Sequence, residues 1–334
     1  MAAYLGTVIS AAHRYRDEFH SEVEIIVVDD ASTDDSVAWL TTDFEQRESI
    51  TLLKLDTNHG FLRAVNEGFQ AAKFPVVLLL NSDVYVEPDC IEKLAPHFES
   101  DDVFAVCCHA RRHSSDRLDG GGKIGLFDRG FWRVFLNYDV MPDESEIELI
   151  SFFGSGGYSA YDREKWMQLG GFQDCLSPNY WEDVEIGYRA WKRGWKMLYE
   201  PSSIVTHVGS VSMKKSSSKN ELDVVSERNR LLMTWINLHD KGMLARHFVW
   251  VLLKLMGSAA SLNWNFIRSF ARALKMLDSV RRARGIEKNA AKVSDRAIDS
   301  NFRELVTKPQ IHVLDSYEAE IAIAERKIAS RTDS

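Results

Sequence analysis

The sequence predicts an α/β fold in which a mostly parallel central sheet is flanked by helices, with a helical extension at the C-terminus. Strand-like apolar runs alternate with helix-like segments through the first 110 residues, which favours parallel strands joined by crossover helices. Five consecutive apolar residues, Val76 to Leu80, fit a strand buried on both faces. From about residue 227 to 284 the apolar residues follow a helical period, which predicts the extension.

The N-terminal part supplies most of the expected sheet. We expect strands at residues 23–28, 50–55, 76–80 and 103–108, and helices at 4–18, 32–46, 61–72 and 89–98. Ser32 or Thr33 is suited to cap the second helix, because a hydroxyl there accepts a backbone N–H of the first turn. Phe61, Val65 and Phe69 recur about one turn apart and give the third helix an apolar face.

The middle of the chain is less regular. Asp119-Gly120-Gly121-Gly122-Lys123 predicts a flexible loop, and it lacks the strand-to-helix context of a phosphate-binding loop. A helix is expected from Glu182 to Arg193, since carboxylates begin it, cations end it and Gly194 suits its C-terminus. Strands are expected at residues 151–161 and 196–199. We divide the chain into an α/β domain, residues 1–235, with halves of about 1–110 and 111–235, and a helical extension with a polar tail, residues 236–334.

The extension raises the question of membrane contact. Residues 245–284 are basic and amphipathic, so they are expected either to contact a membrane surface peripherally or to pack on the α/β domain. The apolar stretch from Phe248 to Leu262 is interrupted by Lys254 and is short for a bilayer, so we expect no transmembrane helix. In the polar tail a helix is expected at residues 317–328.

The composition limits the classes of binding partner and the cellular compartment that we expect. The 334 residues carry a net charge of -8, which argues against nucleic acid as a partner. The four cysteines show no metal-type spacing, and no basic segment precedes an apolar run at the start, so we expect a reduced, cytoplasmic setting. A dehydrogenase is disfavoured, because no Gly-x-Gly-x-x-Gly follows a strand.

Two carboxylate positions stand out as candidate site residues. Asp83 directly follows the apolar run at 76–80, where open α/β sheets bind ligands, and it can offer oxygen to Mg²⁺ or Mn²⁺ bridging to a diphosphate. The alternative is that Asn81-Ser82-Asp83 only turns the chain. Glu182 and Asp183 begin the expected helix, where they are either a general base or ordinary acids at a helix N-terminus.

Several segments together resemble glycosyltransferase family 2, whose fold is called GT-A. The matching segments occur in the family's order at Val27-Val28-Asp29-Asp30-Ala31-Ser32, Asn58-His59-Gly60-Phe61, Asn66-Glu67-Gly68, Leu80-Asn81-Ser82-Asp83, Gly170-Gly171-Phe172 and Trp181-Glu182-Asp183 with Arg189. They span residues 23–232. The chain is most similar to rhamnosyltransferase-like members from bacteria that build surface polysaccharide.

The resemblance implies a nucleotide-diphospho sugar donor and a divalent metal, Mn²⁺ or Mg²⁺. It assigns nucleotide contacts to Asp29, Asp30, Ser32, Asn58, Gly60, Arg63 and Ser82. It assigns the metal to Asp83, with His207 as a further ligand or a structural histidine. Asp29 and Asp30 could instead only cap a helix, and Arg63 could be a solvated helix residue.

The resemblance further implies an inverting transfer to a hydroxyl of a glycan or lipid-linked acceptor, at the inner face of the membrane if the acceptor is lipid-linked. Asp183 is the expected general base and Glu182 the alternative. Contacts to the acceptor or diphosphate are assigned to Gly156, Gly157, Trp181, Arg228 and Arg230. The two arginines could equally be solvated residues at a helix start.

The start of the chain departs from the family pattern. Members open with a strand that ends against the nucleotide, whereas residues 1–20 predict a helix. Either the start is misassigned, or a truncation has damaged the enzyme, or the segment from Tyr4 to Ser10 replaces the strand. A catalytically inactive subunit that serves in binding or assembly is therefore the second functional hypothesis.

Overall fold

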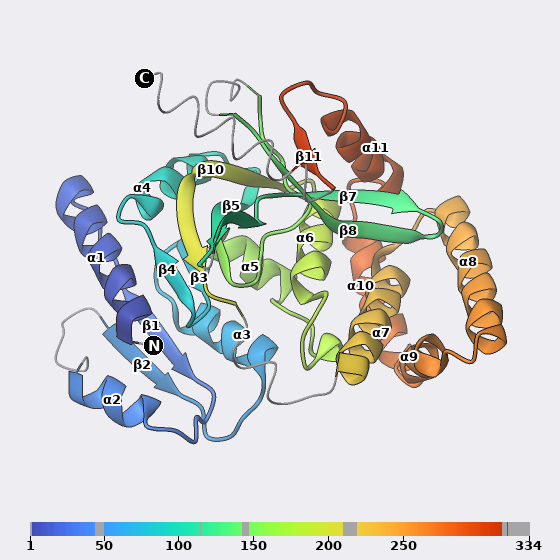
Figure 1. The fold of residues 1–334 in the computed structure, drawn as a ribbon, viewed down its shortest axis with the longest axis horizontal. Helices are drawn as coiled ribbons and strands as arrows, with labels where there is room; N and C mark the ends of the chain where they lie inside the picture. The colour runs from blue at the N-terminus through green and yellow to red at the C-terminus, as the bar shows by residue number, and fades with distance from the viewer. Residues whose placement is uncertain are drawn as a thin grey trace.

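A computed structural model describes residues 2–43, 50–113, 115–141, 147–209, 219–315 and 319, and its described strands form three sheets (Figure 1). The first sheet is the parallel pair β1 (Ile25–Asp29) and β2 (Ile50–Lys54). Between these strands, α2 (Ser36–Asp43) begins later than expected. The Asp34 carboxylate, rather than Ser32 or Thr33, accepts the backbone N–H of Ser36.

The central sheet of the expected α/β fold is mixed rather than purely parallel. Its strand order is β3 (Val76–Leu80), β9 (Tyr158–Asp162), β5 (Val103–Arg112), β10 (Lys196–His207) and β4 (Val84–Val86). Only β5 and β10 pair in parallel; β9 enters antiparallel between β3 and β5, and β4 is antiparallel to β10. Alternation of strands and helices early in the chain could not show that a later strand inserts into the sheet.

Helices, rather than strand pairing, connect the first sheet to the central sheet. In α1 (Ala2–Phe19), Leu5 and Ile9 pack in one cluster with Ile25 of β1, while Ala11 packs in another with Val84 of β4. On α3 (Phe61–Ala71), Phe69 stacks on Trp166 at a centroid distance of 3.8 Å. Within the described residues, β1 and β3 each have one strand neighbour. The five apolar residues of β3 are accordingly half-buried, not buried on both faces as expected.

The glycine-rich segment at residues 119–123 is mostly strand, with Gly121 between the two strands, rather than the expected flexible loop. It joins β6 (Ser115–Gly120), which pairs with β5, to β7 (Gly122–Asp128) of a third sheet. That sheet has the order β11 (His312–Leu314), β8 (Phe131–Asp139), β7. A Cβ at Gly122 would lie 2.2 Å from the Tyr138 ring, and one at Gly120 would lie 2.3 Å from the Tyr158 hydroxyl. The glycines therefore serve close packing.

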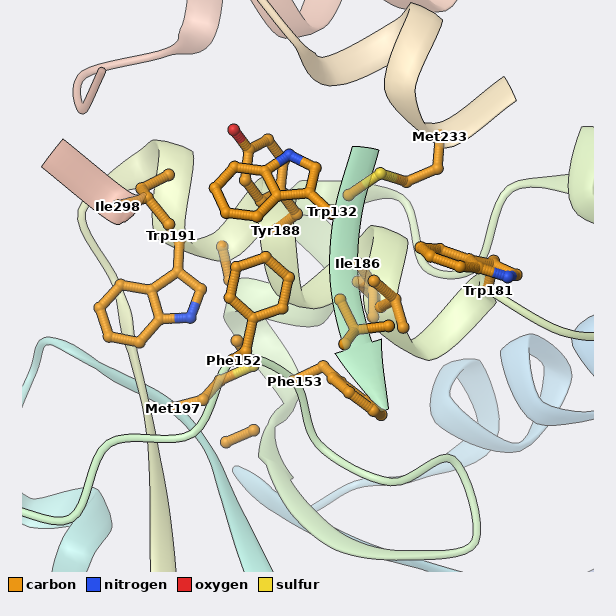
Figure 2. Packing of buried hydrophobic residues seen from close by; sticks show 14 of the residues in the cluster. Trp132, Phe152, Phe153, Trp181, Ile186, Tyr188, Trp191, Met197, Met233 and Ile298 are labelled. Carbon is orange, nitrogen blue, oxygen red and sulfur yellow. The ribbon is translucent and has the colours of Figure 1, made fainter. Parts of the chain in front are cut away.

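The main core lies between the sheets and α6 (Glu182–Arg193), whose bounds match the expectation. Figure 2 shows Trp132 of β8 over Phe152 and Tyr188, with Met233 and Ile298 reaching the same cluster from later helices. Aromatic rings bury large apolar areas, so this cluster supplies much of the driving force for folding. The remaining short helices before α6 are α4 (Cys90–Leu94), η1 (Ala95–Glu99), α5 (Arg163–Leu169) and η2 (Asp174–Leu176).

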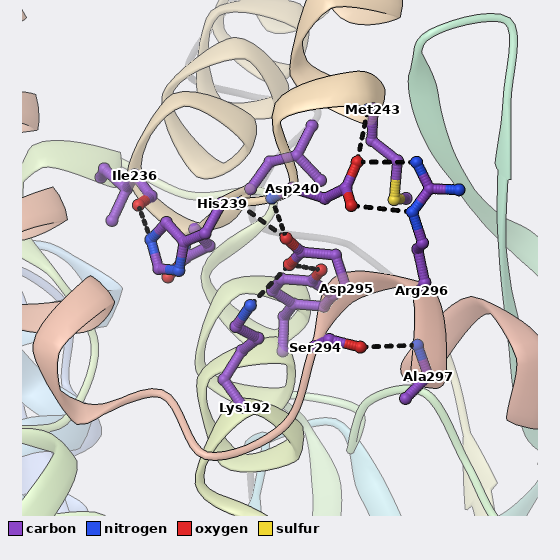
Figure 3. A network of polar contacts seen from close by, with 12 residues as sticks. Lys192, Ile236, His239, Asp240, Met243, Ser294, Asp295, Arg296 and Ala297 are labelled. Atoms are coloured by element: carbon purple, nitrogen blue, oxygen red, sulfur yellow. Dashed lines mark hydrogen bonds and ion pairs between the residues drawn. The ribbon is translucent and has the colours of Figure 1, made fainter.

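The C-terminal region packs on α6. Its helices are α7 (Lys219–Asn237), α8 (Lys241–Ala260), α9 (Trp264–Leu274), α10 (Leu277–Ala290) and α11 (Asp295–Leu305). The buried Asp295 carboxylate accepts the Lys192 ammonium at 2.7 Å, the Tyr188 hydroxyl at 2.6 Å and the backbone N–H of His239 at 2.7 Å (Figure 3). Both parts of the predicted division at residue 235 thus share one core.

The tail contributes more structure than its polar composition suggested. α11 and β11 fold against β7 and β8, whereas the helix expected at residues 317–328 lies almost entirely outside the described residues. Within the described part of the chain, one helix, α8, is long and apolar enough to cross a membrane by length and composition, with a mean hydropathy of 1.2. We had expected none, because the apolar stretch from Phe248 to Leu262 is interrupted by Lys254 and is short for a bilayer. The helix instead begins at Lys241, before that stretch, and is therefore longer than expected.

Candidate active site

An aspartate–histidine–aspartate chain forms one side of the candidate site. His207 ends β10 and pairs with β4, so its ring stands beside Asp83, which follows β3. His207 Nε2 lies 3.4 Å from Asp83 Oδ1, and His207 Nδ1 lies 2.8 Å from Asp119 Oδ2 on β6. Hydrogen bonds to Asp119 and then Asp83 raise the pKa of His207 to about 9. The hydrogen bond from His207 lowers the pKa of Asp83.

This arrangement suits a divalent metal ion. A ligating histidine usually gives its second ring nitrogen to a carboxylate, which is what Asp119 provides, and Nε2 is then directed at Asp83. Mg²⁺ and Mn²⁺ are commonly held by few protein groups and complete their shell with phosphate and water. Within the described residues no set of three or more His, Cys, Asp or Glu side chains surrounds a common point. Asp83 and His207 would therefore be the protein's ligands, and His207 must lose its proton to bind.

The segment from Gly156 to Tyr158 lies beside residues from both parts of the candidate site. The backbone N–H of Asn81 donates to the Gly157 carbonyl at 2.9 Å, and a Cβ on Gly157 would lie 2.5 Å from Asn81 Nδ2. A Cβ on Gly156 would instead lie 3.7 Å from Asp183 Cβ. The Tyr158 ring lies 5.8 Å from the His207 ring. Asp83 and Asp183 thus border the same short segment.

Asp183 and Glu182 occupy different environments at the N-terminus of α6. Asp183 is half-buried, whereas Glu182 is 8% exposed and its Oε2 has no hydrogen-bond partner. Burial, and then the charge of Asp183, raise the pKa of Glu182 to about 8. Burial also raises the pKa of Asp183, opposed by the backbone N–H groups of Val184 and Gly156. By solvent-accessible area Asp183 is therefore the more exposed residue of the two, and Glu182 is its buried neighbour.

A strained backbone turn sets the entry to α6. Tyr180 has φ 71° and Trp181 has φ 73°, a region that costs a residue with a side chain about 1 kcal/mol or more. The Trp181 indole donates to Ser226 Oγ at 3.2 Å, and the Arg230 guanidinium lies 5.6 Å from its ring centre. Arg230 also donates to the Trp132 carbonyl at 3.0 Å. Trp181 and Arg230 thus hold the turn before Asp183, and among the described residues the contacts of Arg230 are with Trp132, Trp181, Phe131 and Glu227 rather than with Asp83.

Lys123 is a buried cation that sequence reasoning missed. Its ammonium donates to Asn137 Oδ1 at 2.7 Å and lies 5.8 Å from the Phe153 ring centre. Burial lowers the pKa of Lys123, and the charges of Asp183 and Asp119 oppose this. Lys123 therefore lies within electrostatic reach of both sides of the site. The only indication in the sequence was that Asp119 and Lys123 flank three glycines, and this pattern predicted a flexible loop.

Several residues predicted to bind the nucleotide lie at the C-terminal end of β1, but their side chains already form hydrogen bonds with backbone groups. Both Asp30 carboxylate oxygens accept backbone N–H groups, from His59 and Gly60, each at 2.7 Å. Asn58 donates to the Asp30 carbonyl at 3.0 Å. Asp29 is buried and accepts the Ser32 N–H at 3.3 Å. Asp30 therefore holds the loop from Asn58 to Gly60 against β1, which shapes this edge of the site.

The remaining predicted residues are more peripheral. Arg63 is exposed on α3, with its Nε 3.6 Å from Glu67 Oε1, which agrees with a solvated helix residue. Ser82 is exposed beside Asp83. Arg228 donates to the Ser177 carbonyl and, at 2.9 Å, to Asn229 Oδ1. Arg228 and Arg230 lie two positions apart on α7 and face different neighbours.

Asn66 and Arg189, which belong to the segments that resemble the family, form hydrogen bonds that hold helices together. Asn66 exchanges hydrogen bonds of 2.9 Å with both backbone groups of Phe172, and Gly171, at φ 68°, leaves room for it. Buried Arg189 donates to Glu185 at 2.9 Å and to the carbonyls of Leu169 and Gly171. These bonds join α3, the end of α5 and α6, so the motif residues position Asp183 from a distance.

Solved structures show which class of α/β protein this fold belongs to. GalNAc-T7 with UDP, GalNAc and Mn²⁺ matches with a TM-score of 0.57 and 20% identity over 71% of this chain and 46% of that one. Residues 1–349 of S. aureus TarS match with a TM-score of 0.50 and 16% identity over 90% of this chain and 88% of that one. At these identities the likeness shows the fold alone, and that fold is GT-A.

Sequence comparison gives the family. Residues 2–169 match the model described as glycosyl transferase family 2, and the chain belongs to that family. The probable N-acetylgalactosaminyltransferase 9 of Caenorhabditis elegans is 24% identical over 214 residues, 61% of this chain and 37% of the relative. An uncharacterized glycosyltransferase of Nostoc sp. is 33% identical over 122 residues, 36% of this chain and 35% of the relative. The chain spans little more than a third of these curated relatives.

Proposed function

We propose that the chain is an inverting glycosyltransferase, which moves a sugar from a nucleotide-diphospho sugar to a hydroxyl acceptor with a divalent metal. One observation carries the proposal: Asp183 lies beside Gly156, while Asp83 pairs with His207, whose ring lies beside Tyr158, so both aspartates lie near one three-residue segment. A single displacement at a sugar carbon requires a group that stabilises the departing diphosphate and a carboxylate that accepts the proton of the attacking hydroxyl, and these residues could supply both.

Each side has a defined role in that displacement. Asp183 takes the proton of the acceptor hydroxyl while that oxygen bonds to the anomeric carbon. The bond from that carbon to the diphosphate oxygen breaks on the opposite face, so the anomeric configuration inverts. A divalent metal bound by Asp83 and His207 would neutralise charge on the departing diphosphate. Lys123, close enough to act electrostatically on Asp183, favours its ionised form.

The finer assignments are proposed on the family resemblance. They are a hexosyl or rhamnosyl donor, a glycan or lipid-linked acceptor, a part in cell-surface polysaccharide or glycan biosynthesis, and a place at the cytoplasmic face of the membrane. The named relatives include N-acetylgalactosaminyltransferases, so an N-acetylhexosamine donor belongs in the same test.

To test this, the purified chain is incubated with Mn²⁺ and UDP-, GDP- or dTDP-linked sugars, and release of the nucleotide is measured. Calorimetry measures binding of the same nucleotide sugars. We expect one donor to bind and to be turned over. Asp183→Asn should keep nucleotide binding and lose about 10²–10⁴-fold in rate, because the amide cannot accept the proton. NMR of the product should show the inverted anomer.

Asp174→Asn provides the matched control, since Asp174 begins η2 outside the site and should leave the rate unchanged. A folded circular dichroism spectrum without nucleotide binding would contradict the proposal and favour an inactive binding subunit. Retention of the donor's anomeric configuration would contradict the inverting mechanism alone.

A further inference from the structure

The outward face of α8 is an apolar surface that the rest of the described chain leaves uncovered. Phe248, Val249, Leu252, Leu253 and Met256 are all about half-exposed or more, with Met256 at 61%. They recur at helical spacing and form one stripe along the helix. Leu262, 73% exposed, and Trp264, 57% exposed, extend it beyond the C-terminal end of α8. We call these seven residues the α8 face.

The opposite side of α8 packs against the protein. Met243, His247 and Val251 are buried, and His247 accepts the Trp235 indole N–H at 2.9 Å. Lys254 pairs with Glu227 of α7 on this inner side. The helix lies at the edge of the molecule, beyond α7 and α9 (Figure 1). Because α8 is held along its length, its apolar outer face suits a surface that it lies on rather than one that it crosses.

Charge indicates which surface this is. Residues 241–277 contain six Lys or Arg and no Asp or Glu, although the chain as a whole has a net charge of -8. Lys254 pairs with Glu227, and Arg268 and Arg272 pair with Glu221, so three of the six are balanced by α7. Lys241 and Arg246, near the start of α8, and Lys275, at the end of α9, are exposed. A second copy of this chain docking about a two-fold axis would bring this basic region against itself. An anionic lipid surface would instead complement both the cations and the apolar stripe, and an exposed Trp suits the headgroup level.

We propose that the α8 face docks on the surface of an anionic phospholipid bilayer. The apolar side chains enter the headgroup boundary, and the surrounding cations contact lipid phosphates. This docking is independent of which sugar is transferred, and it holds the whole enzyme at the membrane.

The test is flotation of the full chain with vesicles of phosphatidylcholine alone or with about a third phosphatidylglycerol. We expect binding to the anionic vesicles at low salt and at least a tenfold loss at roughly 0.5 M salt. The double variant Leu252→Glu with Met256→Glu should also lose at least tenfold. Both positions are already exposed, so thermal unfolding should show a folded protein.

Phe19→Glu is the matched control, because Phe19 is a 51% exposed aromatic residue on α1, far from α8 in the fold (Figure 1). It should float like the wild type. Absence of wild-type binding to anionic vesicles, equal binding to neutral ones, or unchanged binding of the double variant would each overturn the proposal. A wild-type dimer that the double variant converts to monomer, without vesicle binding, would assign the face to a second copy instead.

Discussion

His207 Nδ1 donates to Asp119 Oδ2 at 2.8 Å, which leaves Nε2 directed at Asp83, 3.4 Å away. Asp119 thereby fixes both the orientation of the ring and the nitrogen that is free to bind a metal. Three separate strands meet to make this contact: β6 brings Asp119, β10 brings His207, and Asp83 follows β3. If Asp83 and His207 hold a metal as proposed, Asp119 would orient the histidine without being a ligand itself.

The role of Asp119 can be tested with Asp119→Ala. We expect Mn²⁺ affinity to fall by about 10- to 100-fold, because the histidine loses the partner that orients it. Titration of Mn²⁺ in the presence of UDP, followed by calorimetry, measures the change. Asp128→Ala removes a more exposed carboxylate near the β7–β8 turn and should leave the affinity unaltered. Equal affinities in the two variants would show that Asp119 is not a positioning residue.

Glu182 should make stability depend on pH. Its pKa is about 8 in the folded chain against an ordinary 4.5, so the folded chain keeps a proton that the unfolded chain loses between these values. The free energy of unfolding therefore falls as pH rises through this window. Glu182→Gln resembles the protonated form, so its stability relative to wild type should increase from pH 4.5 to 8.

Urea unfolding at several pH values measures this difference for Glu182→Gln. The exposed Glu304→Gln is the control and should show no pH-dependent gap from wild type. If the free energies of unfolding of the wild type and Glu182→Gln change in parallel between pH 4.5 and 8, Glu182 does not have the raised pKa.

The two adjacent glycines should respond differently to alanine. Gly157→Ala places a Cβ 2.5 Å from Asn81 Nδ2 and should cost about 1–3 kcal/mol of stability, because the short Asn81 side chain must move. In Gly156→Ala the Cβ meets nothing closer than 3.7 Å, so the free energy of unfolding should stay near that of wild type. Denaturant unfolding compares them. If Gly156 borders the substrates, its variant raises KM while it remains folded, and an unchanged KM would remove it from the site.

Asp295 should anchor the C-terminal region to the helix that carries Asp183. Asp295→Ala leaves the Lys192 ammonium buried without its partner, and we expect a loss of about 3–5 kcal/mol in the free energy of unfolding. Thermal and urea unfolding measure the loss. Asp278→Ala removes an exposed carboxylate of α10 and should change stability little. Similar stabilities of the two variants would show that the Asp295 network in Figure 3 does not hold the fold together.

Much of the arrangement could be predicted from local pattern. The strands at Ile25–Asp29, Ile50–Lys54 and Val76–Leu80 lie where apolar runs placed them, and α6 begins and ends at the predicted residues. Runs, caps and charge bias act over a few neighbouring residues, so they are visible in the chain itself. The positions of Asp83 after β3 and Asp183 in the first turn of α6 were accessible for that reason.

What the sequence by itself determined was the order of its elements and the kinds of chemical group at their ends. Only the tertiary structure decided that β9 enters the sheet antiparallel and that Gly120 and Gly122 pack against Tyr158 and Tyr138. It also placed Lys123 close enough to interact electrostatically with Asp183 and Asp119. It also decided that the Asp30 carboxylate accepts backbone amides and that Glu182 is more deeply buried than Asp183. The physical reason is that burial, pairing and electrostatic neighbourhood arise from segments far apart in the chain, whose approach no local pattern encodes.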